Sequence, residues 1–182
     1  MYRFSKSFAA LATLLVVGML LVALVGAENY AVQSPTKTQV EGVWKVTEVV
    51  MPPKNPAEKA TSITDPQPGL MIFTKGYYSA IVVRGTQPRA AVAAAKDPAN
   101  LTDAEKIARY EQWNTFTANS GTYEVKGSTL NMHPIVAKNV EVMTSGTPIT
   151  RELKVEPPNT LWLIPTSDRA TTDPRVKFTK VE

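Results

Sequence analysis

The sequence predicts an all-β protein, an eight-stranded antiparallel up-and-down β-barrel with one inserted helix. Three observations support this prediction. Short segments with alternating apolar and polar residues follow one another from residue 42 to the end of the chain, and turn-forming residues separate them. All but two of the connections between these segments are short, as in hairpins. The longest connection carries the helical pattern.

A hydrophobic leader precedes the predicted barrel. Two basic residues come first, residues 8–25 then carry no charge, and Val25-Gly26-Ala27 offers the small residues at which a signal peptidase cuts. We therefore expect residues 1–27 to be a signal peptide and Glu28 to be the first residue of the mature chain. The uncharged run is also close to the roughly 20 residues that span a bilayer. An uncleaved membrane anchor is therefore the alternative.

Composition suggests a compartment and limits the partners. The chain has no cysteine and therefore no disulfide. Export without disulfides suggests a protein of the bacterial envelope, so we expect the protein to be periplasmic or secreted. Its net charge of +4 falls to +2 when Arg3 and Lys6 leave with the leader, and the remaining charges are scattered. This distribution argues against nucleic acid as a partner. We expect residues 28–39 to be a flexible segment and residues 40–182 to form one barrel domain.

The strands follow from period-two alternation. The first spans residues 42–51 and places Glu48 on the same face as Trp44 and Val46. Residues 52–68 contain five prolines, which lack the N–H that a sheet needs, so this stretch is predicted as a loop. Further strands are predicted at residues 70–74, 77–84, 121–126, 128–136, 149–156, 160–164 and 176–181.

One helix is predicted between the third and fourth strands. The run Thr102-Asp103-Ala104-Glu105 fits a capping box, in which the Thr hydroxyl and the Glu side chain each satisfy the other residue's backbone amide. Apolar residues then recur at helical spacing, at Ala104, Ile107, Ala108, Tyr110 and Trp113. We expect this face to cover an open end of the barrel.

Four motifs in order resemble the bacterial lipocalin-like domain family, of calycin type: Gly42-Val43-Trp44-Lys45, Gly76-Tyr77-Tyr78-Ser79-Ala80, Leu101-Thr102-Asp103-Ala104-Glu105 and Gly121-Thr122-Tyr123-Glu124-Val125. The resemblance covers residues 40–182. It implies an eight-stranded lipocalin-like barrel and brings no shared catalytic motif. Gly42 and Trp44 are expected to be structural, with Trp44 facing the floor of the barrel.

Alternation brings two charged side chains to the inward face. Arg151 shares a face with Leu153 and Val155, and Glu48 shares one with Trp44. A buried unpaired charge is costly, so a contact between Arg151 and Glu48 would satisfy both. In the functional interpretation, Arg151 binds the acidic head group of a small apolar ligand and Glu48 sets its position. The alternatives are a structural ion pair and an arginine stacked over Trp44.

The other candidate site residues are aromatic or flexible apolar groups. We expect Tyr78, Tyr123 and Met132 to line any apolar pocket in the barrel. His133, the only histidine, is expected to face solvent or to be hydrogen-bonded, although Pro134 could mark a bulge that re-aims it. Without cysteine or a second histidine, no metal cluster and no obvious nucleophile triad can be assembled. We therefore expect no cofactor.

Two main function classes follow. The first is an exported, non-enzymatic protein that binds or carries a small apolar molecule in the barrel. The second is a barrel enzyme, an isomerase or hydrolase that uses Glu48, Arg151, His133 or a tyrosine. A filled barrel that acts through its surface, for example through the loop at residues 52–68, is a third possibility. A wide apolar cavity with one charged group favours binding, and several converging polar groups favour catalysis.

The leader generates the first prediction. In the host cell, the intact mass of the exported protein should correspond to a chain that begins at Glu28, because Val25-Gly26-Ala27 fits a cleavage site. Mass spectrometry of the envelope fraction measures this. A full-length chain that fractionates with the inner membrane would instead identify the leader as an anchor.

Overall fold

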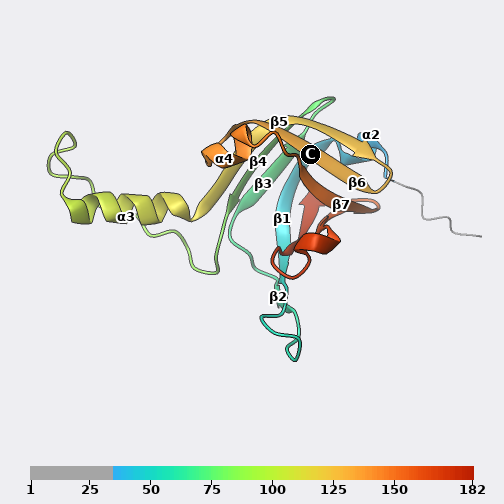
Figure 1. Cartoon of the computed structure of the whole chain (residues 1–182), viewed down its shortest axis with the longest axis horizontal. Helices are drawn as coiled ribbons and strands as arrows, with labels where there is room; N and C mark the ends of the chain where they lie inside the picture. Colours follow the sequence, from blue (N-terminus) through green and yellow to red (C-terminus); the bar gives the residue numbers. More distant parts are fainter. Residues whose placement is uncertain (1–34) are drawn as a thin grey trace, which may run out of the picture. The chain divides into compact units, whose positions relative to one another are not determined.

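Residues 35–182 are described by the computed structural model, and they form a closed antiparallel β-barrel (Figure 1). The predicted leader lies outside these described residues. Within residues 35–182, no helix is long and apolar enough to cross a membrane.

The barrel follows the order of the chain. Strand β1 pairs with β3 on one side and with β9 on the other, which closes the sheet. The predicted all-β, eight-stranded, up-and-down barrel is therefore confirmed. Its strands are β1 (Gly42–Met51), β3 (Gly69–Phe73), β4 (Tyr77–Val83), β5 (Phe116–Lys126), β6 (Thr129–Ala137), β7 (Ile149–Glu156), β8 (Thr160–Pro165) and β9 (Arg175–Lys180).

Most strand bounds agree with the alternation pattern, and β1 and β7 have the predicted ends. Strand β5 begins at Phe116, well before the predicted residue 121. The part that was not predicted, residues 116–120, includes Asn119, a poor strand former, but Asn119 pairs with Ala80 of β4. Tertiary pairing therefore overrides local propensity there.

A ninth strand, β2 (Thr61–Ile63), was not predicted. It lies within the proline-rich stretch 52–68 and pairs with β1, with Ile63 opposite Val49. Three residues are too few to establish a period, so alternation could not find it. The prediction of a loop throughout this stretch was wrong at these residues.

One end of the barrel is filled by a cluster of large side chains. Trp44 is 1% exposed and packs in the core that includes Phe73, Leu130 and Leu161. The short helix α2 (Lys37–Val40) covers this end, so the last part of the predicted flexible segment is helical. Val40 is fully buried, and its carbonyl oxygen accepts a hydrogen bond of 2.7 Å from Trp44 Nε1. Trp44 therefore lies inside the barrel at this end, which we call the floor.

Both the backbone conformation and the surroundings of Gly42 restrict this position to glycine. Its φ of +131° is a conformation that other residues rarely adopt. A side chain at this position would also collide with the backbone oxygen of Glu182. The close approach of the chain's end to the start of β1 therefore requires glycine.

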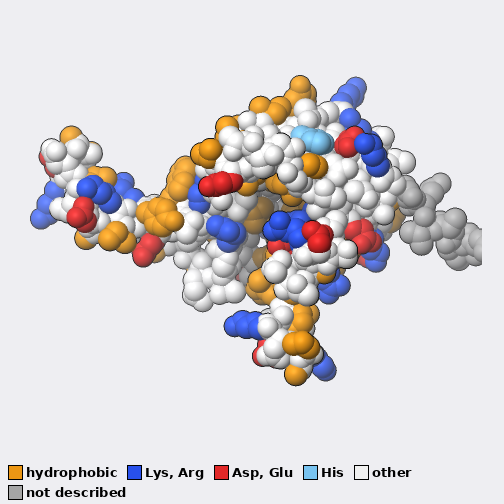
Figure 2. Space-filling model, in the orientation of Figure 1, with side chains coloured by type: hydrophobic (Ala, Val, Ile, Leu, Met, Phe, Trp, Pro, Cys, Tyr) orange, Lys and Arg blue, Asp and Glu red, His pale blue; other side chains and the backbone are white. Residues whose placement is uncertain are grey.

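The inserted helix, α3 (Asp103–Asn114), begins with the predicted capping box, and Thr102 Oγ1 accepts the amide of Glu105. The expectation that it covers the barrel was wrong, since none of its residues is buried. Ile107, Tyr110 and Trp113 are 57%, 66% and 56% exposed, and apolar side chains show at the surface over α3 in Figure 2. The helix is tied to the barrel at its C-terminal end and extends away from it (Figure 1).

The floor generates the second prediction. Trp44→Ala should lower the free energy of unfolding by about 3 to 5 kcal/mol, because it removes a buried ring and leaves a cavity. Chemical denaturation followed by circular dichroism measures this. Trp162→Ala is the matched control, since Trp162 is only partly buried and lies under Lys177 Nζ at 5.4 Å. Equal losses from the two changes would contradict the central role of Trp44.

Candidate functional site

The floor of the barrel holds three of the predicted ligand-lining residues. Tyr78, Tyr123 and Met132 are buried and belong to the core cluster around Phe73, whose ring lies 4.9 Å from that of Tyr123. Tyr78 donates to Asn119 Oδ1 at 2.7 Å and Tyr123 donates to the Thr74 carbonyl at 2.7 Å. Burial raises the pKa of both tyrosines to about 12. They are thus neutral packing groups with satisfied hydroxyls.

The opposite end of the barrel contains a cavity of about 370 Å³. None of Tyr78, Tyr123 and Met132 lines it. Its walls come from β1, β2, β4 and β9, from the segment between β2 and β3, and from the residues just beyond β4 and just before β9. The lining side chains are mostly apolar and include Val46, Val49, Met51, Ile63, Val82, Val176 and Phe178. We call this space the mouth cavity.

A bulge in β1 determines which side chains reach the mouth cavity. The register between β1 and β9 shifts between Val46, which faces Phe178, and Glu48, which faces Lys177. A bulge adds one residue and reverses the alternation beyond it. Val49 therefore joins Val46 in the cavity wall. The prediction that Glu48 shares the inward face of Trp44 was wrong for this reason.

Glu48 instead makes contacts outside the mouth cavity. Its carboxylate accepts a hydrogen bond of 2.5 Å from Ser62 Oγ and lies 3.6 Å from Lys177 Nζ. These contacts tie β1 to β2 and to β9. A role for Glu48 in binding remains a prediction.

Arg151 lies on the predicted face of β7. Its neighbours across the sheet are Leu130 and Pro165, both buried, and its side chain is 21% exposed. The predicted contact with Glu48 was wrong: Arg151 Nη2 donates to Asp173 Oδ2 at 2.8 Å. Asp173 follows the short 3₁₀ helix η1 (Ser167–Arg169), and Arg169 Nε binds the same oxygen at 2.8 Å.

The carboxylate that Arg151 and Arg169 share is largely buried, since only 15% of the Asp173 side chain is exposed. Burial opposes its ionisation, but the hydrogen bond from Arg169 and the charges of Arg151 and Arg169 outweigh burial. The pKa of Asp173 is therefore lowered from its ordinary value. Asp173 thus shares one negative charge between Arg151 and Arg169. A role for Arg151 in ligand binding remains a prediction.

His133 lies on an exposed part of β6, with its Nε2 4.0 Å from Glu124 Oε1. The predicted bulge is present, because the register between β5 and β6 shifts between the pairs Ser120–Val136 and Gly121–Pro134. Gly121 is required beside this bulge, since a side chain there would collide with the His133 carbonyl. Among residues 35–182, no group of acidic and histidine side chains could hold a metal ion.

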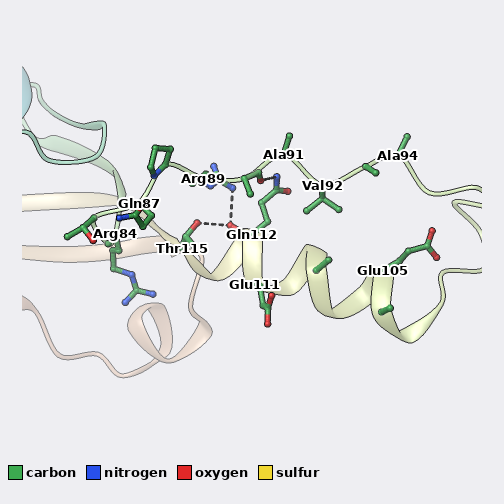
Figure 3. Close-up of a pocket in the computed structure, with 17 residues that line it drawn as sticks. Arg84, Gln87, Arg89, Ala91, Val92, Ala94, Glu105, Glu111, Gln112 and Thr115 are labelled. Carbon is green, nitrogen blue, oxygen red and sulfur yellow. Dashed lines mark hydrogen bonds between the residues drawn. The ribbon is translucent and has the colours of Figure 1, made fainter.

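A second hollow of about 770 Å³ lies along α3, outside the barrel. Figure 3 shows its walls, which are α3 and the extended segment 84–94. Arg89 Nη2 donates to the Gln112 carbonyl at 3.1 Å, and the Gln112 side chain donates to the Ala90 carbonyl at 2.9 Å. These contacts hold the segment beside the helix. The hollow is more open to solvent than the mouth cavity.

Arg84 is a site residue that the sequence did not reveal. It lines both the mouth cavity and the hollow along α3, and among residues 35–182 it is the only charged residue in the wall of the mouth cavity. In the sequence it is simply the last residue of a predicted strand. No local pattern distinguishes it, because its position at the mouth depends on the pairing of β4 with β5.

Comparison with known proteins gives two structural likenesses. No family model matches the chain, and no curated protein sequence matches it. A lipocalin-like protein from Bacteroides uniformis ATCC 8492 is 16% identical, with a TM-score of 0.42 over 78% of this chain and 98% of that one. An uncharacterized protein from Bacteroides eggerthii DSM 20697 is 10% identical, with a TM-score of 0.38 over 77% of this chain and 98% of that one.

The strand pairing of this chain defines its fold. Eight strands meander in sequence order, β9 returns to β1, and a short helix with a buried tryptophan closes one end. The chain has a lipocalin-like fold. Barrels of eight strands are either filled by side chains or wide enough for one small ligand. In this barrel the free space is the mouth cavity.

The Arg151–Asp173 pair generates the third prediction. Asp173→Asn should lower the free energy of unfolding at neutral pH by about 1 to 3 kcal/mol, because the carboxylate receives charge-assisted hydrogen bonds. The folded-state pKa of Asp173 is depressed, so this stabilisation is fully present above the unfolded pKa of about 4 and is lost as the pH falls through the folded pKa. Denaturation midpoints measured from pH 7 down to pH 2 test this.

Glu152→Gln is the control for this prediction, because Glu152 is the exposed neighbour of Arg151 on β7. It should have little effect at any pH. The double variant Arg151→Met with Asp173→Asn should lose less than the two single losses added together, since both remove the same interaction. A loss from Asp173→Asn that does not change with pH would rule out the ion pair as its cause.

Proposed function

We propose that this protein binds or carries a small apolar molecule in the mouth cavity. The observation that carries the proposal is the cavity itself. It has about 370 Å³ of space, within the roughly 300 to 1,000 Å³ that is usual for small-molecule sites. Its walls are mostly valine, methionine and proline side chains. Such walls favour an apolar ligand, because both surfaces lose contact with water on binding.

The chemistry of the lining favours binding over catalysis. General acid–base catalysis needs titratable groups within hydrogen-bonding reach of a reacting atom. Of the described side chains in the cavity wall, only that of Arg84 is charged. The groups first considered for an enzyme do not meet there: Glu48 and His133 lie outside the lining, and Arg151 is bound to Asp173.

We also propose that the protein acts outside the cytoplasm, in the periplasm or as a secreted protein. Residues 1–27 support this location through their signal-peptide pattern. A carrier of apolar molecules suits an aqueous compartment between membranes, because such molecules are poorly soluble in water.

The fourth prediction tests the mouth cavity with a matched pair of variants. Val82 lines the cavity, and its neighbour Ile81 is 55% exposed on the other face of β4. Val82→Phe should reduce binding of the neutral fluorescent probe N-phenyl-1-naphthylamine by about tenfold or more, because the ring occupies the ligand's space. Ile81→Phe adds the same volume outside and should leave the affinity unchanged.

Fluorescence titration of the mature protein measures both affinities, and thermal unfolding confirms that both variants are folded. Wild-type protein that fails to bind the probe would overturn a general apolar-binding function. Equal binding by wild type and a folded Val82→Phe variant would show that the probe binds elsewhere. The hollow along α3 would then be the next position to block.

A further inference from the structure

Helix α3 presents an apolar ridge that stays exposed among residues 35–182. Ile107, Tyr110 and Trp113 occur at every third position of the helix, and each is more than half exposed. Another side of the helix faces the segment 84–94, since Ala108 lines the hollow there and the three ridge residues do not. We call Ile107, Tyr110 and Trp113 the helix ridge.

The length and surroundings of α3 indicate that the helix ridge has a partner. Isolated helices shorter than about 12 to 15 residues are only marginally stable in water. Helix α3 has 12 residues, and none of them is buried. Most helices in proteins are stabilised by packing an apolar face against another element. Within residues 35–182, no element packs against the helix ridge closely enough to bury it.

A second exposed apolar surface lies on the outside of the barrel, over β3 and β4. Leu70, Ile72 and Ile81 point outward there, whereas their neighbours Met71 and Ala80 are buried in the core. Leu70 lies opposite Ile81 in the pairing of the two strands. A shallow groove of about 270 Å³ runs between these side chains. We call this surface the outer patch, and it includes Gly69, Leu70, Ile72, Ser79, Ile81 and Val83.

None of these six residues of the outer patch is charged, and the surface beside it on β5 is also uncharged. The outward residues of β5 next to the patch are Phe116, Ala118, Ser120 and Thr122. Ser120 Oγ donates to Ser79 Oγ at 2.9 Å, so these two hydroxyls bind each other. An uncharged outer face fits an apolar protein partner. It does not fit an anionic lipid surface, which attracts clusters of lysine and arginine.

The helix ridge and the outer patch match in length, and their areas decide how they meet. Helix α3 is about 18 Å long and β4, with 7 residues, is about 23 Å long. At roughly 100 Å² for each half-exposed large side chain, the three ridge residues and the three isoleucine and leucine residues of the patch bury about 600 Å² in one contact. One contact is only as large as a crystal-packing contact, but two contacts bury about 1,200 Å², which reaches the range of specific interfaces.

We propose that the protein forms a two-fold dimer in which the helix ridge of each copy packs on the outer patch of the other. The C-terminal end of α3 lies beside the patch, because Val83 pairs with Phe116 and the Arg84 amide donates to the Thr115 carbonyl at 2.6 Å. From that end, α3 extends away from its own barrel (Figure 1). A two-fold axis beside this end therefore carries each helix over the outer patch of the second copy. This inference is independent of the proposed binding function.

Three isoleucines of similar exposure provide matched variants: Ile107 in the helix ridge, Ile81 in the outer patch and Ile135 on β6, at 57%, 55% and 62%. Sedimentation velocity of protein purified from the envelope fraction, at about 1 to 200 μM, should show a dimer with a Kd on the order of 10 μM. Ile107→Lys and Ile81→Lys should each raise this Kd about tenfold or more, because each places a charge against an apolar surface. Ile135→Lys should leave it unchanged. Circular dichroism checks that the variants are folded.

The chain has no cysteine, which allows a cross-linking test of the arrangement. A mixture of the Ile107→Cys and Ile81→Cys variants, treated with a bismaleimide, should give covalent dimers on a denaturing gel. Each variant alone should give none, because neither site meets its own copy in the proposed dimer. A mixture of Ile107→Cys and Ile135→Cys is the control and should also give none.

The other arrangements give different results. Wild type that stays monomeric over the whole concentration range would overturn the dimer. Covalent dimers from Ile107→Cys alone would show that α3 packs on α3, and those from Ile81→Cys alone that two outer patches meet; either result would overturn the exchange of helices. Monomeric wild type that cosediments with phosphatidylcholine vesicles, when Ile107→Lys does not, would assign the helix ridge to a lipid surface instead.

Discussion

The packing around Trp44 determines which end of the barrel can hold a ligand. Its indole N–H binds the carbonyl of Val40, which fixes α2 across the floor and buries Val40 completely. Phe73, Tyr78 and Tyr123 fill the adjoining volume, and both tyrosine hydroxyls have acceptors. Protein interiors packed in this way leave few voids larger than a water molecule. Free space of ligand size therefore lies at the other end of the barrel, in the mouth cavity.

The bulge in β1 sets the chemistry of that open end. If β1 continued with regular alternation past Val46, the carboxylate of Glu48 would lie among Val82, Val176 and Phe178. An unpaired charge in such surroundings costs several kcal/mol, on the order of 2 to 7 even for a neutral polar group. The bulge directs Glu48 to Ser62 and Lys177 and brings Val49 into the wall. One extra residue thus exchanges a charged group for an apolar one at the mouth.

Regular alternation is what made most of this fold predictable, and the errors occur where regularity ends. The bounds of β1 and β7 followed from period-two patterns, and the placement of Arg151 on its face of β7 was correct. Its partner Asp173 lies in the irregular segment after η1, to which no period applies. The bulge that moves Glu48 depends on the register with β9, far away in the sequence. Arg84 belongs to the site through pairing of β4 with β5, and nothing around it in the sequence indicates this.

Helix α3 does not cover an open end of the barrel as expected, but its C-terminal end holds three basic side chains in position. Arg84, Arg89 and Lys138 bind the last carbonyl groups of the helix, so the helix is fixed to the barrel at one end and its apolar side chains remain exposed along the rest. The same hydrogen bonds hold the three cations in place at the rim of the barrel. The helix therefore contributes to the mouth by placing charge at its rim, even though it covers none of the cavity.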